Sequence, residues 1–368
     1  MRACGGMVRL LVALACLLAL PLSAAAESMI RIAVVEGARA VTVKAEGLRA
    51  RALTDDGFYA AVPGGVAQLS PRGGAVVLGD GAPAEAVKLR ADGPISVGGK
   101  TVRGSVEIRA DAAGLLVVNE LPMESYLAAV LGSEMPPSFA PEALKAQAVA
   151  ARTYAIGKKI AAEGQPYHLG STVLAQVYGG VHSEDPRTRA AVEATVGEVL
   201  VYDYAPIEAY FFASCGGTTA DGAEALGRPL PYLTSHTCPE RGDTPGARWT
   251  LKLAPAELGS RLGTGEVRSI EIETRTAEGR ARTVTVRSAR GSRRFTAVEL
   301  RQRLGYGALK SLSFEVNRRG GTFEFAGRGM GHGAGLCQWG AQAAAQDGWD
   351  YRRILAHYYP GAELRRMY

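Results

Sequence analysis

The fold is decided by residues 119–164, NELPMESYLAAVLGSEMPPSFAPEALKAQAVAARTYAIGKKIAAEG. This stretch predicts the end of a strand followed by two helices. The first helix is short and must stop near Pro136 and Pro137, because the residue before a proline is driven out of the helical conformation. The second helix begins at Pro141, which suits a first helical turn, and carries lysines near its negative end.

The two faces of this second helix differ in chemistry. Lys145 and Arg152 lie seven residues apart and are expected on one side, about 10.5 Å apart along the axis. The opposite side carries Ala148, Ala151 and Ala155, which allow another element to approach closely. A largely buried helix with two cations needs an anionic partner, either a protein carboxylate or a substrate group. The alternative is that Lys145 and Arg152 lie on an exposed face of the helix and are simply solvated.

The flanking sequence favours strands on the N-terminal side and mixed structure on the C-terminal side. From about 29 to 118, short apolar segments separated by Gly and Pro predict a small antiparallel β unit. Residues 251–316 show three strand patterns and two short helical patterns, which predict an inserted lobe. The chain then ends with two strands, a glycine-rich bend and a helix from about Leu336.

The predicted fold class is therefore α+β, with a β-rich N-terminal portion, a central helix packed on mixed sheet, and an additional small α/β lobe. We expect a signal peptide over residues 1–26, a β-rich region over 27–106 and a second domain over 107–361, with the lobe inside it.

The composition excludes several protein classes. The 368 residues carry 42 Lys and Arg against 36 Asp and Glu, and 47% are hydrophobic, which is typical of folded globular proteins and excludes disordered and collagen-like chains. No basic run with interleaved aromatic residues occurs, so we expect no nucleic-acid partner.

The N-terminus resembles a secretory signal. Arg2 and Arg9 precede the apolar run LLVALACLLALPL, and the small residues of SAAAES offer a cleavage position before Glu27. We therefore expect a secreted, extracytoplasmic protein. The alternative is an uncleaved anchor, which would be the only contact with the membrane.

Export bears on the cysteines, because thiols oxidise outside the cytoplasm. Cys215 and Cys238 are candidates for a disulfide, which would close a loop of about 24 residues and contribute about 3 kcal/mol in the chain-entropy model. The other two of the five cysteines, Cys4 and Cys16, lie in the predicted signal, so Cys337 would then remain free in the mature chain. Two alternatives stay open: all three are small buried apolar residues, or Cys215 is a thiolate nucleophile with His332 as its base.

Motifs for metal or cofactor chemistry are absent from the sequence. None of the five His forms an H-E-x-x-H pattern and no C-x-x-C occurs, so we expect no metal and no cofactor. The glycines of GRGMGHGAG, residues 327–335, allow positive φ angles around His332. A histidine held in such a bend can orient a neighbour or contact a sugar, or it can simply bond to the backbone.

Six motifs together resemble a known family, the SpoIID/LytB family, which is the sporulation stage II protein D group with its amidase-enhancer relatives. They are NELPMESYLAAVLGSEMP, LKAQAVAARTYA, AQVYGG, ASCGGTTAD, GRGMGHGAGLCQWGAQ and ILAHYYPGAEL, in this order between about 107 and 361. The resemblance implies action on bacterial peptidoglycan glycan strands, possibly beside other cell-wall hydrolases. Its enzymatic members are lytic transglycosylases that cut the bond between N-acetylmuramic acid (MurNAc) and N-acetylglucosamine (GlcNAc). The alternative is a non-catalytic wall-binding protein that enhances an amidase.

The resemblance also assigns site residues. The catalytic acid is implied to be Glu134 of the EMP motif. Some relatives bind zinc near the Q-x-Y motif, but Leu169 and Ala175 stand here where cysteines would be needed, so we expect no metal there. The implied substrate-binding residues are Lys145, Arg152, Gln176, Tyr178, Ser214, His332 and Gln338.

One carboxyl group suffices for lytic cleavage, because the same group protonates the glycosidic oxygen and then deprotonates the C6 hydroxyl of the sugar. Ordinary glycosidases need two carboxyl groups. Asp221 and Glu224 are candidates for the second one, so hydrolysis remains an alternative. To act as an acid near neutral pH, Glu134 needs a raised pKa, which desolvation by its apolar neighbours would supply. Those neighbours are Met135, Pro136, Pro137 and Phe139.

A cation paired with Glu134 would favour the carboxylate and remove its acidity. We therefore expect Lys145 and Arg152 to lie away from Glu134 and to face the substrate's lactyl carboxylate or N-acetyl carbonyl. That carboxylate is free only in strands without a stem peptide, so the sequence predicts a preference for denuded glycan.

Overall fold

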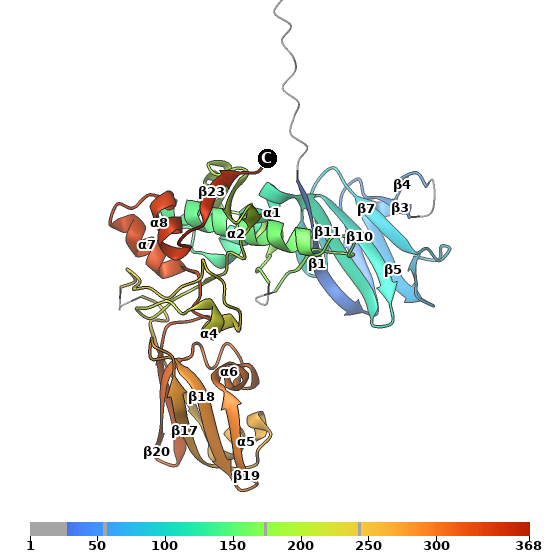
Figure 1. Ribbon diagram of the computed structural model, residues 1–368. Coiled ribbons are helices and arrows are strands. Elements are labelled where there is room, and N and C mark those ends of the chain that lie inside the picture. Colours follow the sequence, from blue (N-terminus) through green and yellow to red (C-terminus); the bar gives the residue numbers. More distant parts are fainter. Residues whose placement is uncertain (1–27, 54–56, 173–174, 242–243) are drawn as a thin grey trace, which may run out of the picture.

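The computed structural model describes residues 28–53, 57–172, 175–241 and 244–368. The expected signal peptide over 1–26 and its cleavage position lie outside these residues. The chain forms a β-rich N-terminal part, a central group of helices, and a separate lobe that extends from it (Figure 1). The α+β fold class with a β-rich N-terminus is confirmed.

The N-terminal part contains two antiparallel sheets that share one hydrophobic core. In β1, Ile30 and Ile32 are buried, and β1 pairs with β11 so that Ile30 lies opposite Leu121. β10 crosses the expected boundary between residues 106 and 107, and the sheet continues to the end of β11. The strands are β1 (Met29–Ala38), β2 (Val41–Lys44), β3 (Arg49–Ala52), β4 (Ala60–Ala61), β5 (Val66–Arg72), β6 (Ala75–Leu78), β7 (Ala86–Arg90), β8 (Ile95–Val97), β9 (Lys100–Val102), β10 (Ser105–Asp111) and β11 (Gly114–Pro122).

Both predicted central helices are confirmed. α1 (Met123–Glu134) follows β11 directly and ends just before the paired prolines. α2 (Pro141–Ala161) has Pro at its first turn and lysines in its last turn. Its Ala-rich face is fully buried, and α2 packs against α1, α3, α7, α8 and β13, so it is the central element of the helical part (Figure 1).

Short elements complete the wall around α2. The bend before β22 brings the glycine-rich segment to β15, since Phe211 pairs with Leu336 in a parallel ladder. The helix expected from about Leu336 is α7, and α8 follows it. These elements are β12 (Leu169–Gly170), η2 (Gly180–Ser183), α3 (Pro186–Glu193), β13 (Glu198–Tyr202), β14 (Ala205–Pro206), β15 (Phe211–Phe212), α4 (Gly222–Leu226), β22 (Leu336–Cys337), α7 (Gln338–Gln346), α8 (Tyr351–Tyr358) and β23 (Glu363–Arg366).

The lobe has a hydrophobic core of its own and is joined to the rest by two chain crossings. Its elements run from Arg248 to Arg328, around the expected range 251–316. They are β16 (Arg248–Leu253), α5 (Pro255–Leu262), β17 (Val267–Arg275), β18 (Ala281–Ser288), β19 (Gly291–Thr296), α6 (Ala297–Leu304), β20 (Ser313–Arg319) and β21 (Thr322–Arg328).

Within the described ranges, no helix combines the length and the apolar character that crossing a membrane requires.

Candidate functional site

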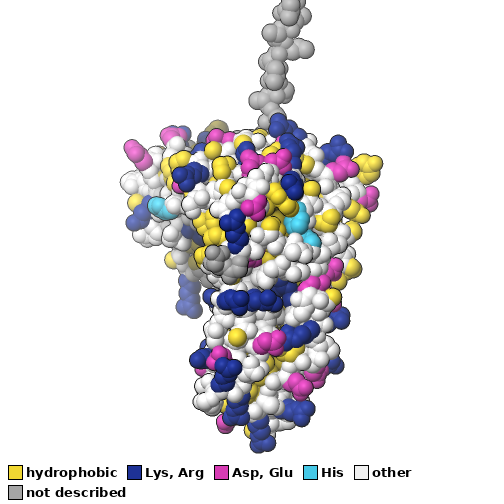
Figure 2. Space-filling view, turned by 90° about the vertical axis from the view of Figure 1, so that its left-hand side faces the viewer, with side chains coloured by type: hydrophobic (Ala, Val, Ile, Leu, Met, Phe, Trp, Pro, Cys, Tyr) yellow, Lys and Arg dark blue, Asp and Glu magenta, His cyan; other side chains and the backbone are white. Residues whose placement is uncertain are grey.

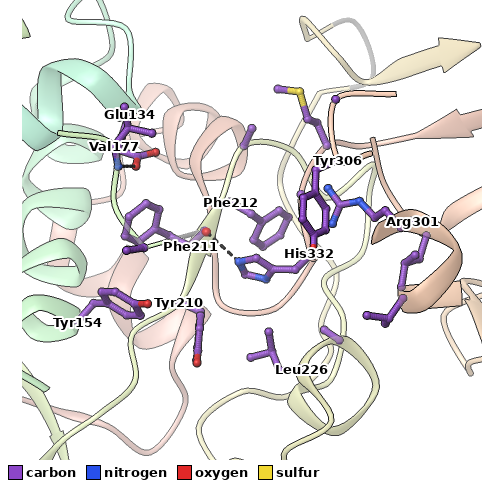
Figure 3. Close-up of a pocket in the computed structure, with 18 residues that line it drawn as sticks. Glu134, Tyr154, Val177, Tyr210, Phe211, Phe212, Leu226, Arg301, Tyr306 and His332 are labelled. Carbon is purple, nitrogen blue, oxygen red and sulfur yellow. Dashed lines mark hydrogen bonds between the residues drawn. The ribbon is translucent and has the colours of Figure 1, made fainter. Parts of the chain in front are cut away.

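A cavity of about 600 Å³ lies between the central helices and the lobe. Glu134 stands on one side of it, and Arg301 and Tyr306 from the lobe stand on the other (Figure 3). Aromatic side chains form much of the wall between them, which gives broad apolar faces of the kind that stack on sugar rings. These are Tyr154, Tyr210, Phe211, Phe212 and Tyr306.

Glu134 is the last residue of α1 and lines this cavity. Its Oε1 accepts a hydrogen bond of 2.7 Å from the backbone N–H of Val177 (Figure 3), and Oε2 has no hydrogen bond to any described residue. Desolvation by burial raises the pKa of Glu134, and the Val177 hydrogen bond opposes this rise in part. The partial negative charge at the end of α1 also disfavours the carboxylate.

Glu134 is the single carboxylate that lines the cavity within the described part of the chain. Asp221 caps α4 by accepting from the backbone N–H of Ala223, and Glu224 pairs with Arg282. Neither lines the cavity. The two candidates for a second acid therefore belong to the framework around α4.

The Q-x-Y segment positions Glu134 through its middle residue. Gln176 is fully buried, where it accepts from the Tyr126 hydroxyl at 2.9 Å and donates to the Ala151 carbonyl at 3.1 Å. Tyr178 is also buried and donates to the side chain of Asn119. Both were expected to contact substrate, but their polar groups bind the protein interior. They hold the backbone so that Val177 faces the cavity and donates to Glu134.

Arg152 does not face the cavity, which corrects the expectation from the sequence. It is 0% exposed, and its guanidinium forms two hydrogen bonds of 2.9 and 2.7 Å with the carboxylate of Glu124 on α1. It also donates to the carbonyls of Val192 and Glu198. Its anionic partner is thus a protein carboxylate, and Arg152 joins α1 to α2.

Lys145 is also directed to a protein carboxylate. Its Nζ lies 2.7 Å from Glu142 on the same helix, and the side chain is not part of the cavity wall. Neither Lys145 nor Arg152 forms an ion pair with Glu134, because their partners are Glu142 and Glu124. No cation among the described residues pairs with Glu134, so its raised pKa is not cancelled by an ion pair.

His332 lines the cavity, but both of its ring nitrogens bond to the backbone. Nε2 lies 3.0 Å from the Phe211 carbonyl, and Nδ1 accepts from the N–H of Ala334 at 3.2 Å. This pattern fits a neutral ring with the proton on Nε2, and burial lowers the pKa of His332 to about 4. His332 therefore holds Phe211 in place and cannot serve as a base for Cys215.

Ser214 and Gln338, expected as substrate contacts, lie outside the cavity wall. Ser214 donates to Glu240, and Gln338 is buried with its amide 3.5 Å from Gln147. The three cysteines of the described chain are free and buried, so the expected disulfide between Cys215 and Cys238 is not formed in the structure.

The sequence analysis missed the cation of the site, Arg301 on α6. Its Nε and Nη2 donate to the carbonyls of Leu309 and Lys310, and its guanidinium lies 4.9 Å from the ring centroid of Tyr306. No described carboxylate pairs with Arg301. Desolvation lowers its pKa to about 10, so it stays charged at neutral pH. No local signal distinguishes this arginine from its neighbours in VELRQRL.

The surface view shows Lys and Arg side chains crossing the waist where the lobe meets the rest of the molecule (Figure 2). With a formal net charge of +6, the chain favours polyanionic material, and this strip places part of that charge at the junction that also contains the cavity.

Comparison with known proteins identifies the relatives. A family described as Stage II sporulation protein matches residues 111–202. The chain is 32% identical to stage II sporulation protein D of Bacillus amyloliquefaciens, over 67% of this chain and 75% of that protein. It is 31% identical to the protein of the same name from Bacillus subtilis (strain 168), over 74% and 82%. The chain belongs to the SpoIID family.

Two further similarities bear on the site of this SpoIID-family chain. It is 31% identical to a Bacillus subtilis protein named amidase enhancer, over 65% of this chain and 40% of that protein. A family described as a domain of unknown function matches residues 248–335, which include the lobe. The SpoIID match contains Glu134 and Val177, whereas the second match contains Arg301 and His332. The cavity is therefore built from both segments.

Proposed function

We propose that this protein is a lytic transglycosylase that cleaves the MurNAc–GlcNAc bond of peptidoglycan glycan strands, with Glu134 as both acid and base. The observation that carries the proposal is that one carboxyl group, with a raised pKa, lines the aromatic cavity among the residues that the structure describes. A hydrolase of the usual kind needs a second carboxyl group. Membership of a family named for a sporulation protein, with a relative named amidase enhancer, supports a cell-wall substrate.

In the first step, protonated Glu134 donates its proton to the glycosidic oxygen, and the bond between this oxygen and C1 of MurNAc breaks. Oε2 carries the proton, because Oε1 is occupied by Val177. Once the proton has left, the Val177 N–H stabilises the new carboxylate.

In the second step, the carboxylate removes the proton of the C6 hydroxyl of the same MurNAc. The C6 oxygen bonds to C1 and closes a 1,6-anhydro ring. Glu134 is then protonated again and no water is consumed. Burial suits both steps, because an acid works best when its pKa lies near the working pH.

Arg301 replaces Lys145 and Arg152 as the cation that would bind the lactyl carboxylate of the substrate. It is a charged group on the cavity wall opposite Glu134, and Nη1 has no hydrogen bond to any described residue. A lactyl carboxylate bound there would neutralise a partly desolvated cation without reaching Glu134. This supports a preference for strands that have lost their stem peptides.

The decisive experiment is mass spectrometry of isolated glycan strands after incubation with the protein. We expect new 1,6-anhydro-MurNAc ends with the wild-type chain and none with Glu134→Gln. The matched control is Glu163→Gln, which changes an exposed carboxylate in the turn after α2. If wild type yields no new ends but accelerates an added N-acetylmuramoyl-L-alanine amidase, the amidase-enhancing alternative replaces the enzyme.

A further inference from the structure

A second cluster of reactive groups lies beside the cavity. The sulfur atoms of Cys215, Cys238 and Cys337 and a carboxylate oxygen of Glu240 all lie within 4.8 Å of one another. They come from three segments: the loop after β15, the loop before β16, and the junction of β22 with α7. All three thiols are free.

The carboxylate of Glu240 is held so that one oxygen faces the thiols. Its Oε1 accepts from the hydroxyls of Ser214 and Thr244, at 2.5 and 2.8 Å. Its Oε2 lies 2.9 Å from Cys215 Sγ and 3.5 Å from Cys337 Sγ. A tetrahedral zinc site with bonds of about 2.3 Å to sulfur separates its ligand atoms by about 3.8 Å. The four groups need only small side-chain movements to reach that geometry.

The surroundings supply the outer contacts that metal-bound thiolates use. The backbone N–H groups of Gly217 and Gly340 each donate to a sulfur at 3.3 Å, to Cys215 and Cys337 respectively. Such donors spread the negative charge of a thiolate and fix its direction. The Tyr358 hydroxyl lies 3.1 Å from Cys238 Sγ.

Positive charge is also present around the cluster. Cys337 caps the N-terminus of α7, whose partial positive charge favours an anionic ligand. Arg280 is 4% exposed and donates to the Cys215 carbonyl at 3.0 Å. Both offset the charge that three thiolates and one carboxylate leave on a divalent ion.

We propose that Cys215, Cys238, Cys337 and Glu240 bind one Zn²⁺ ion. Each thiol releases its proton to solvent as its sulfur coordinates, and soft sulfur ligands select zinc over magnesium or calcium. The sequence predicted no metal anywhere in the chain, so this proposal departs from that expectation. The proposed site is also distinct from the segment around Ala175. A disulfide between Cys215 and Cys238 is the competing state, because it would remove two of the four ligands.

The proposed ion has a structural role. Four protein ligands close its coordination shell and leave no position for a substrate. It joins the loop after β15 to the start of α7. Phe211 and Phe212 of β15 and His332, which precedes β22, lie next to these segments in the chain and line the cavity. Glu134 comes from α1 and is not a member of the cluster, so zinc binding can be measured separately from the proposed catalysis.

The first test measures the full-length wild-type chain and needs no variant. Elemental mass spectrometry should find one zinc ion per chain. Denaturation with a chelator should expose Cys215, Cys238 and Cys337 to alkylation, and peptide mapping separates them from Cys4 and Cys16. Replacing zinc with Co²⁺ should give the thiolate-to-metal charge-transfer band and the intense visible bands of a tetrahedral site. A metal-free chain with Cys215 and Cys238 joined by a disulfide would overturn the proposal.

Variants then assign the ligands. Cys337→Ser and Glu240→Gln should each lower zinc affinity by about 10- to 100-fold or more. The control Tyr358→Phe keeps all four ligands and should retain one zinc ion per chain. Unchanged zinc affinity in Cys337→Ser would overturn the assignment, whatever the activity of that variant on glycan.

Discussion

The backbone N–H of Val177 donates a 2.7 Å hydrogen bond to Oε1 of Glu134. This bond is the link between α1, which carries the carboxyl group, and the Q-x-Y segment, whose two polar side chains are buried. It stabilises the carboxylate, whereas burial of Glu134 stabilises the protonated form. Burial has the larger effect, so Glu134 holds its proton to a higher pH than an exposed glutamate does.

The raised pKa of Glu134 predicts the pH dependence of stability. Between the ordinary pKa of Glu, about 4.3, and the raised pKa, the folded chain keeps a proton that the unfolded chain has lost. Stability therefore falls as pH rises through this window. Glu134→Gln lacks the titration, so its Tm should gain on wild type as pH rises and then stay level above the raised pKa. A Tm difference that is constant with pH would contradict this assignment.

The Val177 hydrogen bond predicts a shift in the pH profile of activity. Val177→Pro removes the donor, so the pKa of Glu134 should rise further and the alkaline fall of activity should move up by about one pH unit. Val177→Ala keeps the N–H and is the matched control, with the alkaline limb unchanged. Equal shifts in both variants would show that loss of packing, and not of the donor, is responsible.

Breaking the ion pair of Arg152 and Glu124 should lower the stability of the fold and leave substrate selectivity unchanged. Arg152→Met leaves Glu124 without its buried partner and should cost about 3 kcal/mol in urea unfolding. The double variant Arg152→Met with Glu124→Gln should recover part of that loss. The cleavage rate per folded molecule should be unchanged on denuded and peptide-bearing strands. A loss confined to denuded strands would restore Arg152 to the substrate site.

Because His332 is neutral in the folded chain, we expect the stability of the protein to fall in acid. Its pKa of about 4 in the folded chain lies below the ordinary value of about 6.5. Between these values the unfolded chain binds a proton that the folded chain does not, so stability is lost as pH falls from 6.5 toward 4. His332→Gln can still donate to the Phe211 carbonyl and should flatten this part of the Tm profile. An unchanged acid slope in that variant would place its origin elsewhere.

Local signals were enough to predict the helices. Motif resemblance selected Glu134 as the catalytic acid, and the structure places this residue in the cavity wall. Pro141 and the lysines near residue 160 mark the two ends of one helix, so the local sequence is enough to predict where α2 begins and ends. The partner of Arg152 is different, because Glu124 lies 28 residues earlier on another helix. A helical spacing shows which side chains share a face, but only tertiary packing shows what that face contacts.

The same limit applies to the cavity and the cysteine cluster. The cavity takes Glu134 from α1 and Arg301 from the lobe, and no sequence pattern relates these two positions. The three cysteines are far apart in the chain, and only the parallel pairing of β15 with β22 brings Cys337 to the loop that holds Cys215. The sequence predicted a pairing of two thiols because it could not show that the third lies beside them.

The position of Arg301 predicts substrate selectivity. Arg301→Gln removes the positive charge from the wall opposite Glu134, and the loss of a charged hydrogen bond should lower kcat/KM on denuded strands by about 10- to 100-fold. Strands with stem peptides carry an amide in place of the lactyl carboxylate, so they should lose far less. Arg303→Gln on the same helix is the matched control, because Arg303 pairs with Glu299 and does not line the cavity. A structural defect from the lost contacts to Leu309 and Lys310 would lower both rates equally, and equal losses would therefore reject Arg301 as the carboxylate site.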